Sequence, residues 1–470
     1  MQDLSSKGRA CRRHGATILG LLTILTTMLS GCTVGMPPDA PATAVSPTRP
    51  AAATVLPAQG TPASTAAPGA TTPADGTPSS ATTEALLSLT WWTPEFYSPQ
   101  APQPAGPLLA EQLAVFEASE GGQVLVTPVL KARYGEGGLL DFLRTAQPVA
   151  PAILPDLITL DVTELERAVA AGLLQPLDML LDEDVTAGLY PFALSAGVFD
   201  DRRMGVQHIA NMAHVAYLTS QVEAPPATWD MLLEEDLPYL FPLGNPQANS
   251  ASSPTERLQH AILSQYYSTG VTVDSVTRAP LLELEPLIRL LEFYDAAAES
   301  GVLPPGAQEL TEPDAVWGVY VQGKVPLAYV SARRYLAERE ALRGSGYAAA
   351  PGWAGPAAPI ADGWAFAIVT TDPERQRAAA ALIAWLMQPE NSGAWAQAAG
   401  WLPTSPAALS VMRSTPYHQF LDSQLRVAIS PPIGPDYVQV AARIQRAIVS
   451  VLQEDVAPAE AAQQAVNAQR

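Results

Sequence analysis

The chain has 470 residues and carries 26 basic against 46 acidic side chains, which gives a net charge of −20 at pH 7. This length suffices for two lobes with separate cores. The acidic excess argues against nucleic acid, and against an anionic membrane surface, as a binding partner.

The first 31 residues have the pattern of an export signal. Four basic residues precede position 14, and the apolar run over residues 16–29 is short for a membrane span. The quartet Leu-Ser-Gly-Cys that ends at Cys32 resembles a lipobox, in which cleavage precedes the cysteine and the thiol is acylated. The alternative is an ordinary signal with an incidental cysteine. We predict a lipoprotein signal peptide over residues 1–31 and lipidation at Cys32.

Residues 32–86 are predicted to form the anchor cysteine and a disordered tether. Alanine, proline, threonine and serine dominate this segment, which has almost nothing to bury. Such a composition cannot offset the entropy of ordering the chain. The only other cysteine, Cys11, lies in the signal, so we expect neither a disulfide nor a thiolate metal site in the mature protein.

The start of the folded body alternates strands with helices. An alternating strand is expected over residues 87–92, a helix over 107–119 and a second strand over 124–129. A third strand over 157–160 and a helix over 164–171 follow. This order predicts an α/β fold with parallel strand pairing.

A later stretch also predicts a strand followed by a capped helix. Residues 365–370 form a short apolar, partly β-branched run that is typical of a buried strand. Asp372 then suits the N-cap and Pro373 the first position of a helix that Pro389 stops. A second amphipathic helix is expected to end near the Gly-Trp-Leu-Pro sequence at residues 400–403.

Several motifs, taken together, resemble one protein family. Pro-Asp-Leu-Ile at 155–158, Gly-Leu-Leu-Gln-Pro-Leu-Asp at 172–178, Pro-Ala-Thr-Trp-Asp at 226–230 and Gly-Lys-Val-Pro-Leu-Ala-Tyr at 323–329 recur in the order and spacing of that family. The chain thus resembles the bacterial extracellular solute-binding proteins, the maltose-binding-protein-like family of ABC importers. One departure is Gln207, which replaces the family's usual proline.

The resemblance implies a periplasmic-binding-protein type II fold, with two discontinuous α/β lobes joined by a hinge. Lobe one is expected over residues 87–197 and 359–410. Lobe two is expected over residues 198–358 and 411–470.

Catalytic signatures are scarce. The chain lacks HExxH, GxSxG, SxxK, GxxxxGK[ST] and CxxC. A glycosidase pair such as Glu95 with Asp156 is the open alternative, although any acidic protein offers such pairs. We expect a binding protein rather than an enzyme, with no cofactor and no metal.

Sugar recognition uses aromatic faces against the apolar face of a pyranose and planar polar groups for its hydroxyls. Side chains of both kinds fall at strand ends or in the turns beyond them, where the family places its cleft. The candidate ligand-binding residues are Trp92, Glu95, Tyr97, Gln207, Asn211, Tyr329, Arg333, Asp362, Gly363, Trp364 and Tyr437.

These candidates have competing structural interpretations. Trp92 and Trp364 fit ligand stacking and lobe packing equally well, and Gly363 would let the backbone approach a ligand. Many sugar-binding members carry a Gly-x-Trp after the Gly-Lys strand, whereas this chain has Ser-Ala-Arg-Arg-Tyr at 331–335. Arg333 in the cleft would favour a carboxylate or phosphate group; otherwise it covers a helix.

The expected function is that of an extracellular lipoprotein anchored to the cell membrane, on its extracellular or periplasmic face. It would be a monomer that binds a solute, most simply a carbohydrate, and delivers it to ABC permease subunits. Two alternatives stay open. One is an importer component for an anionic solute such as a uronate or glycerophosphodiester. The other is a non-transport sensor or adhesion module with the same fold.

Overall fold

The computed structural model describes residues 86–244, 258–342 and 344–468. The predicted signal over 1–31, the lipidation site at Cys32 and the tether up to residue 85 lie outside the described residues. No helix in these described ranges combines the length and the apolar content that a membrane span needs.

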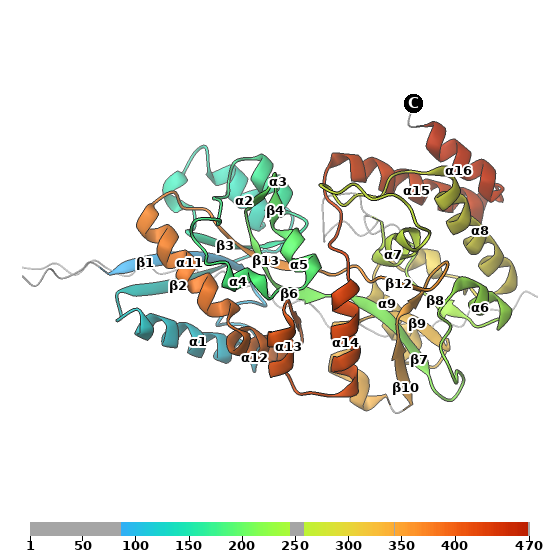
Figure 1. The fold of residues 1–470 in the computed structure, drawn as a ribbon, viewed down its shortest axis with the longest axis horizontal. Coiled ribbons are helices and arrows are strands. Elements are labelled where there is room, and N and C mark those ends of the chain that lie inside the picture. The colour runs from blue at the N-terminus through green and yellow to red at the C-terminus, as the bar shows by residue number, and fades with distance from the viewer. Residues whose placement is uncertain (1–85, 245–257, 343, 469–470) are drawn as a thin grey trace, which may run out of the picture. The chain divides into compact units, whose positions relative to one another are not determined.

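The larger of the two main sheets has six strands (Figure 1). In spatial order they are β14 (Leu402–Pro403), β6 (Val206–Asn211), β13 (Asp362–Ile368), β3 (Leu157–Asp161), β1 (Leu87–Pro94) and β2 (Val124–Lys131). Strand β1 pairs in parallel with β2 and β3, as the helix–strand alternation predicts. Strands β13, β6 and β14, for which no direction was predicted, pair antiparallel with their neighbours, so the sheet is mixed. The reason is that β13 enters the sheet at the end where β3 leaves it, with Trp364 opposite Asp161.

The smaller main sheet has four strands and lies later in the chain. They are β10 (Ser345–Ala348), β7 (Ala213–Leu218), β9 (Leu327–Ser331) and β8 (Tyr239–Leu240). Two short antiparallel pairs complete the strands. They are β4 (Val198–Phe199) with β5 (Arg202–Arg203), and β11 (Ala350–Pro351) with β12 (Pro356–Ala357).

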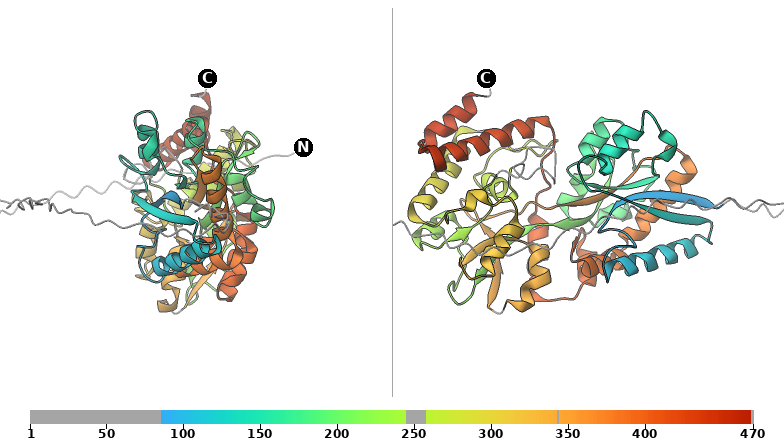
Figure 2. Two further views of the ribbon diagram at one scale, coloured as in Figure 1. Left: turned by 90° about the vertical axis from the view of Figure 1, so that its left-hand side faces the viewer. Right: turned by 180° about the vertical axis from the view of Figure 1, so that it is seen from behind.

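Helices accompany both sheets (Figures 1 and 2). Those drawn around the larger sheet are α1 (Ala105–Ser119), α2 (Leu139–Ala146), α3 (Leu165–Ala170), α4 (Asp184–Ala187), α5 (Pro191–Ala196), α11 (Pro373–Met387), α12 (Pro389–Ala399) and α13 (Pro406–Val411). The others are α6 (Trp229–Glu234), α7 (His260–Ser268), α8 (Leu284–Ser300), α9 (Pro313–Tyr320), α10 (Ala332–Glu338), α14 (Pro416–Val427), α15 (Pro435–Glu454) and α16 (Pro458–Asn467). Of these, α15 and α16 pack on each other and on α8.

The expected strand and capped helix after residue 364 are confirmed. The β13 residues from Ala365 to Ile368 are fully buried, and strands pair with β13 on both of its edges. The Asp372 carboxylate accepts hydrogen bonds from the backbone N–H groups of Glu374 and Arg375, at 2.9 and 3.0 Å, and Pro373 opens α11.

One segment passes directly from the larger sheet to the smaller. Strand β6 ends at Asn211, and β7 begins at Ala213 after the single residue Met212. We expected residues 198–358 to belong to the second lobe. Strand β6 lies within this range, but it pairs with β13 and β14 of the larger sheet. The first crossing between the sheets therefore lies at Met212, more than ten residues beyond the expected boundary.

Candidate functional site

A cavity of about 430 Å³ lies where the two sheets meet. Its walls come from the ends of β6 and β9, the start of β13, and the first residues of α7, α9 and α10. Three of the candidate residues, Asn211, Arg333 and Asp362, line it together. A pocket of this size falls at the lower end of the range that small-molecule sites occupy.

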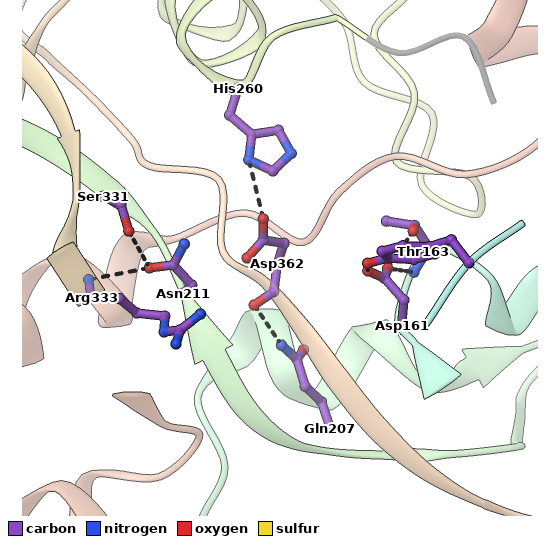
Figure 3. Close-up of polar contacts among 9 residues, drawn as sticks. Asp161, Thr163, Gln207, Asn211, His260, Ser331, Arg333 and Asp362 are labelled. Carbon is purple, nitrogen blue, oxygen red and sulfur yellow. Dashed lines mark hydrogen bonds and ion pairs between the residues drawn. The ribbon is translucent and has the colours of Figure 1, made fainter. Parts of the chain in front are cut away.

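Asn211, the last residue of β6, is held from one side. Its Oδ1 accepts hydrogen bonds from the Ser331 hydroxyl at 3.2 Å and from the Arg333 backbone N–H at 3.4 Å (Figure 3). Both donors are at the junction of β9 and α10. With the oxygen engaged twice, the amide orientation is determined, and Nδ2 has no acceptor among the described residues. Asn211 therefore offers an N–H donor to the cavity.

Asp362, at the start of β13, is held through its backbone. The side-chain nitrogen of Gln207 donates to the Asp362 carbonyl at 3.1 Å (Figure 3). The same nitrogen donates to the Ile209 carbonyl at 3.2 Å. The carboxylate projects the other way, with Oδ2 at 3.6 Å from Nδ1 of His260, the first residue of α7. Gln207 is completely buried, so it positions Asp362 from behind. The carboxylate presents acceptors in the same cavity as the Asn211 donor.

Gly363 supports this arrangement through the backbone. Its φ is +150°, and a Cβ added there would stand 2.0 Å from the carbonyl oxygen of Ile209. The glycine was expected to let the backbone approach a ligand. The structure shows instead that it lets β13 approach β6, next to an irregularity in their pairing between Trp364 and Ala365.

The Arg333 guanidinium lies over an aromatic ring. Its guanidinium carbon is 3.6 Å from the centre of the Trp401 ring, and its Nε donates to the Gly400 carbonyl at 3.3 Å. Burial lowers the pKa of Arg333, and the carboxylates of Asp314 and Asp362 oppose that shift. The two Nη nitrogens have no acceptor among the described residues. They are therefore available as donors.

Trp401 was not among the candidates, although the Gly-Trp-Leu-Pro sequence that contains it was noted as the end of a helix. Gly400 ends α12 in the left-handed conformation, which turns the chain so that Trp401 faces Arg333. The local sequence does not predict this contact, because Arg333 and Trp401 are 68 positions apart.

An aromatic cluster continues from Trp401 into the larger sheet. Phe96 packs against Trp401 and Trp364 with ring centres 5.1 Å away in both cases. Tyr134 packs against Trp364 at 5.9 Å, and its hydroxyl donates to Asp161. Burial raises the pKa of Tyr134, and the Asp161 carboxylate raises it further. Trp364 is only 3% exposed, so in this conformation its ring faces protein.

The Asp161 carboxylate also organises the turn after β3. It accepts a hydrogen bond from the backbone N–H of Thr163 at 2.9 Å, and Figure 3 shows the pair apart from the Asn211 group. Neither Asp161 nor Thr163 lines the cavity.

The remaining candidates lie outside the cavity. Trp92 stacks on Phe142 at 5.1 Å, under the Lys131 ammonium, because its β1 position faces helix α2. Tyr97 is buried against Trp395, with ring centres 4.2 Å away. Both rings are core contacts.

Two tyrosines and one glutamate complete the placement of the candidates. Tyr329 is buried inside the four-stranded sheet, opposite Val215. The Tyr437 hydroxyl accepts a hydrogen bond from the backbone N–H of Leu258 at 3.1 Å, so it supports a residue of the cavity wall from behind. Glu95 is exposed and pairs with Arg133 at 2.9 Å.

The carboxylates considered as a glycosidase pair lie at different positions along strand β1. Asp156 accepts from the Thr90 backbone N–H at 2.8 Å and pairs with Arg375 at 2.9 Å. Glu95 lies beyond the far end of β1, five residues from Thr90 and thus roughly 16 Å along an extended strand. Glycosidase carboxylates lie roughly 5 to 9.5 Å apart, so these two do not form such a pair. Within the described ranges no group of three or more His, Cys, Asp or Glu residues is placed to hold a metal ion.

The sequence from residue 133 to 417, more than half of the chain, matches the family of bacterial extracellular solute-binding proteins, and the protein belongs to that family. A comparison with curated protein sequences finds no significant match.

Solved structures of similar fold include the cyclic alpha-maltosyl-1,6-maltose binding protein from Arthrobacter globiformis. It has 18% identity and a TM-score of 0.63, over 81% of this chain and 98% of that one. The sugar-binding protein MalE from Xanthomonas citri has 18% identity and a TM-score of 0.63, over 81% and 96%. The maltotriose binding protein of Thermus thermophilus has 19% identity and a TM-score of 0.56, over 81% and 98%. The fold is thus the type II periplasmic-binding-protein fold that the sequence predicts.

Proposed function

We propose that the protein binds a carbohydrate in the cavity formed by Asn211, Arg333 and Asp362. The observation that carries this proposal is the convergence of donors and an acceptor on one space. A sugar hydroxyl both donates and accepts, so it can bridge an amide or guanidinium N–H to a carboxylate. Several solved proteins of the same fold are described as maltose or maltotriose binding proteins, which supports the same class of ligand.

The charges around the cavity favour a neutral ligand over an anionic one. The wall contains the carboxylates of Glu312, Asp314 and Asp362. Against them stand the guanidinium groups of Arg333 and Arg334, and Arg334 pairs with Glu338 at 2.8 Å. A carboxylate or phosphate ligand would be attracted by the Arg333 guanidinium but repelled by the three carboxylates of the wall, which carry the same sign of charge as the ligand. A neutral polyhydroxylated ligand meets no such repulsion.

We further propose that the protein works as the solute-binding component of an ABC importer. In this proposal the two lobes close over the solute and present the closed shape to a permease, and no bond is broken. The lobes we propose comprise residues 87–211 with 362–411 and residues 213–361 with 412–470. The lipobox-like quartet at Cys32 supports a lipid anchor on the extracellular or periplasmic face, with the segment up to residue 86 as the tether.

A panel of solutes tests the ligand class. The purified full chain is heated with neutral sugars, uronates, amino acids and glycerophosphodiesters. A ligand at about one hundred times its Kd adds about 2.7 kcal/mol to folding stability, because it binds only the folded state. We expect an increase of a few degrees in Tm for at least one neutral sugar or polyol. Stabilisation by amino acids or by the anionic compounds alone would refute the carbohydrate proposal.

A further inference from the structure

The wall of the cavity contains no tryptophan, tyrosine or phenylalanine among the described residues, and the imidazole of His260 is its one aromatic ring. Sugar rings are commonly held by aromatic side chains that cover their apolar face. A wall without such rings can hold a ligand through hydrogen bonds, but offers little to an apolar ring face.

An aromatic face does lie directly behind this wall. Trp401 is 7% exposed and does not line the cavity, whereas the arginine stacked on it does. The guanidinium of Arg333 covers one side of the ring, and Phe96 packs beside it at an angle of 31°. Arg333 therefore stands between the Trp401 ring and the space available to a ligand.

The position of Arg333 is held by only a few contacts. Its backbone N–H donates to Asn211 and its Nε to the Gly400 carbonyl, at 3.4 and 3.3 Å, which are both long. Figure 3 shows the guanidinium beside the Asn211 side chain. The carboxylates of Asp314 and Asp362 also act on its charge and oppose the lowering of its pKa by burial. The guanidinium carbon is only 3.6 Å from the centre of the Trp401 ring, so the contact with this ring contributes to its placement.

We propose, as an extension of the carbohydrate function proposed above, that Arg333 determines specificity by masking Trp401. With Arg333 in place, the cavity selects compact solutes that bind through hydrogen bonds to their hydroxyl groups, namely monosaccharides and alditols. Hydrogen bonds from the Arg333 Nη atoms and Asn211 Nδ2, and to Asp362, provide the recognition. Maltodextrin chains, whose pyranose rings gain from an aromatic platform, are disfavoured.

Isothermal titration calorimetry on the full chain tests this assignment. The probes are D-glucose, D-galactose, D-sorbitol and D-mannitol on one side, and maltose and maltotriose on the other. We expect at least one compact probe to bind wild type about 10-fold more tightly than either maltodextrin. Arg333→Ala removes the donors and uncovers Trp401, so the compact probe should weaken by about 10-fold or more while maltotriose gains affinity.

Two further variants separate this role from a general disturbance. The double variant Arg333→Ala/Trp401→Ala should lose the gain for maltotriose, because the platform is gone. Arg289→Ala, which removes an arginine from the Trp353 ring outside the cavity, should leave the preference unchanged. Far-UV circular dichroism confirms that each variant is folded.

The outcomes distinguish the two proposals. Wild type that binds maltotriose as tightly as the compact probes, or Arg333→Ala with an unchanged preference, would overturn the masking role and leave carbohydrate binding intact. Wild type that binds no sugar or alditol at all would overturn both.

Discussion

Gly363→Ala is expected to destabilise the protein by about 3 to 5 kcal/mol. The new Cβ would stand 2.0 Å from the Ile209 carbonyl oxygen, a backbone atom that cannot rotate away. It would also meet the Gln207 side-chain nitrogen at 2.8 Å and force a non-glycine residue to a φ of +150°. Strands β6 and β13 would then have to separate where they carry Asn211 and Asp362. Thermal unfolding should show a drop of about 5 to 10 °C in Tm.

Gly355→Ala is the matched control for this substitution. Gly355 has an ordinary φ, and no heavy atom lies within 4 Å of a Cβ placed there. We expect its Tm to stay within about 1 °C of wild type, since the change alters little beyond the unfolded chain. Equal stability of the two variants would contradict the close approach of β13 to β6.

His208→Phe is expected to make the protein more resistant to acid. The His208 ring is buried, stacked on Phe366 at 4.0 Å and close to Tyr97 at 4.6 Å. Burial lowers the pKa of His208 to about 3. The backbone of Trp364 lies close enough to offset part of this shift, but its geometry falls short of a hydrogen bond, so neither ring nitrogen has a partner among the described residues.

The direction of the pH dependence follows from that lowered pKa. The unfolded chain takes up a proton on His208 near pH 6.5, which the folded protein resists down to about pH 3. The stability contributed by the neutral ring is therefore complete above pH 6.5 and is lost as the pH falls towards 3. At pH 4.5 the loss from this single group is about 2 to 3 kcal/mol. Phenylalanine keeps the stacking and takes up no proton.

Chemical denaturation at pH 7.0 and pH 4.5 measures this effect. The difference in unfolding free energy between the two pH values should be about 2 to 3 kcal/mol smaller in His208→Phe than in wild type. Carboxylates titrate equally in both proteins and cancel. His418→Gln provides the comparison at a half-buried histidine, where we expect the substitution to change this pH-dependent difference in unfolding free energy by less. If His208→Phe lost as much unfolding free energy between pH 7.0 and pH 4.5 as wild type, that result would contradict a buried, neutral His208 ring.

The local elements of the fold could be predicted because their causes are local. Strand β13 follows from a short apolar run, and α11 from Asp372 and Pro373 at its start. Thr228 caps α6 in the same way, within the Pro-x-Thr-Trp-Asp motif. The antiparallel pairing of β13 could not be predicted, because strand direction depends on where the chain returns from the other sheet.

The candidate site could be predicted only in part. Asn211, Arg333 and Asp362 meet in one cavity, whereas Trp92 and Tyr97 are buried in the core. Residue type and position after a strand cannot distinguish these cases, since both faces of the larger sheet are covered by protein. Trp401 was missed because its partner Arg333 comes from a distant segment.

Calorimetric titration of Asp362→Ala tests the central claim, that the cavity at Asn211, Arg333 and Asp362 is the ligand site. The probe is whichever neutral sugar or polyol raises the Tm of wild type. Removing the acceptor leaves ligand hydroxyls unpaired, so the Kd should rise about 10- to 100-fold while far-UV circular dichroism stays unchanged. Glu95→Ala, which removes an exposed carboxylate outside the cavity, should bind like wild type. An Asp362→Ala protein that binds the probe with wild-type affinity would contradict the assignment of the site.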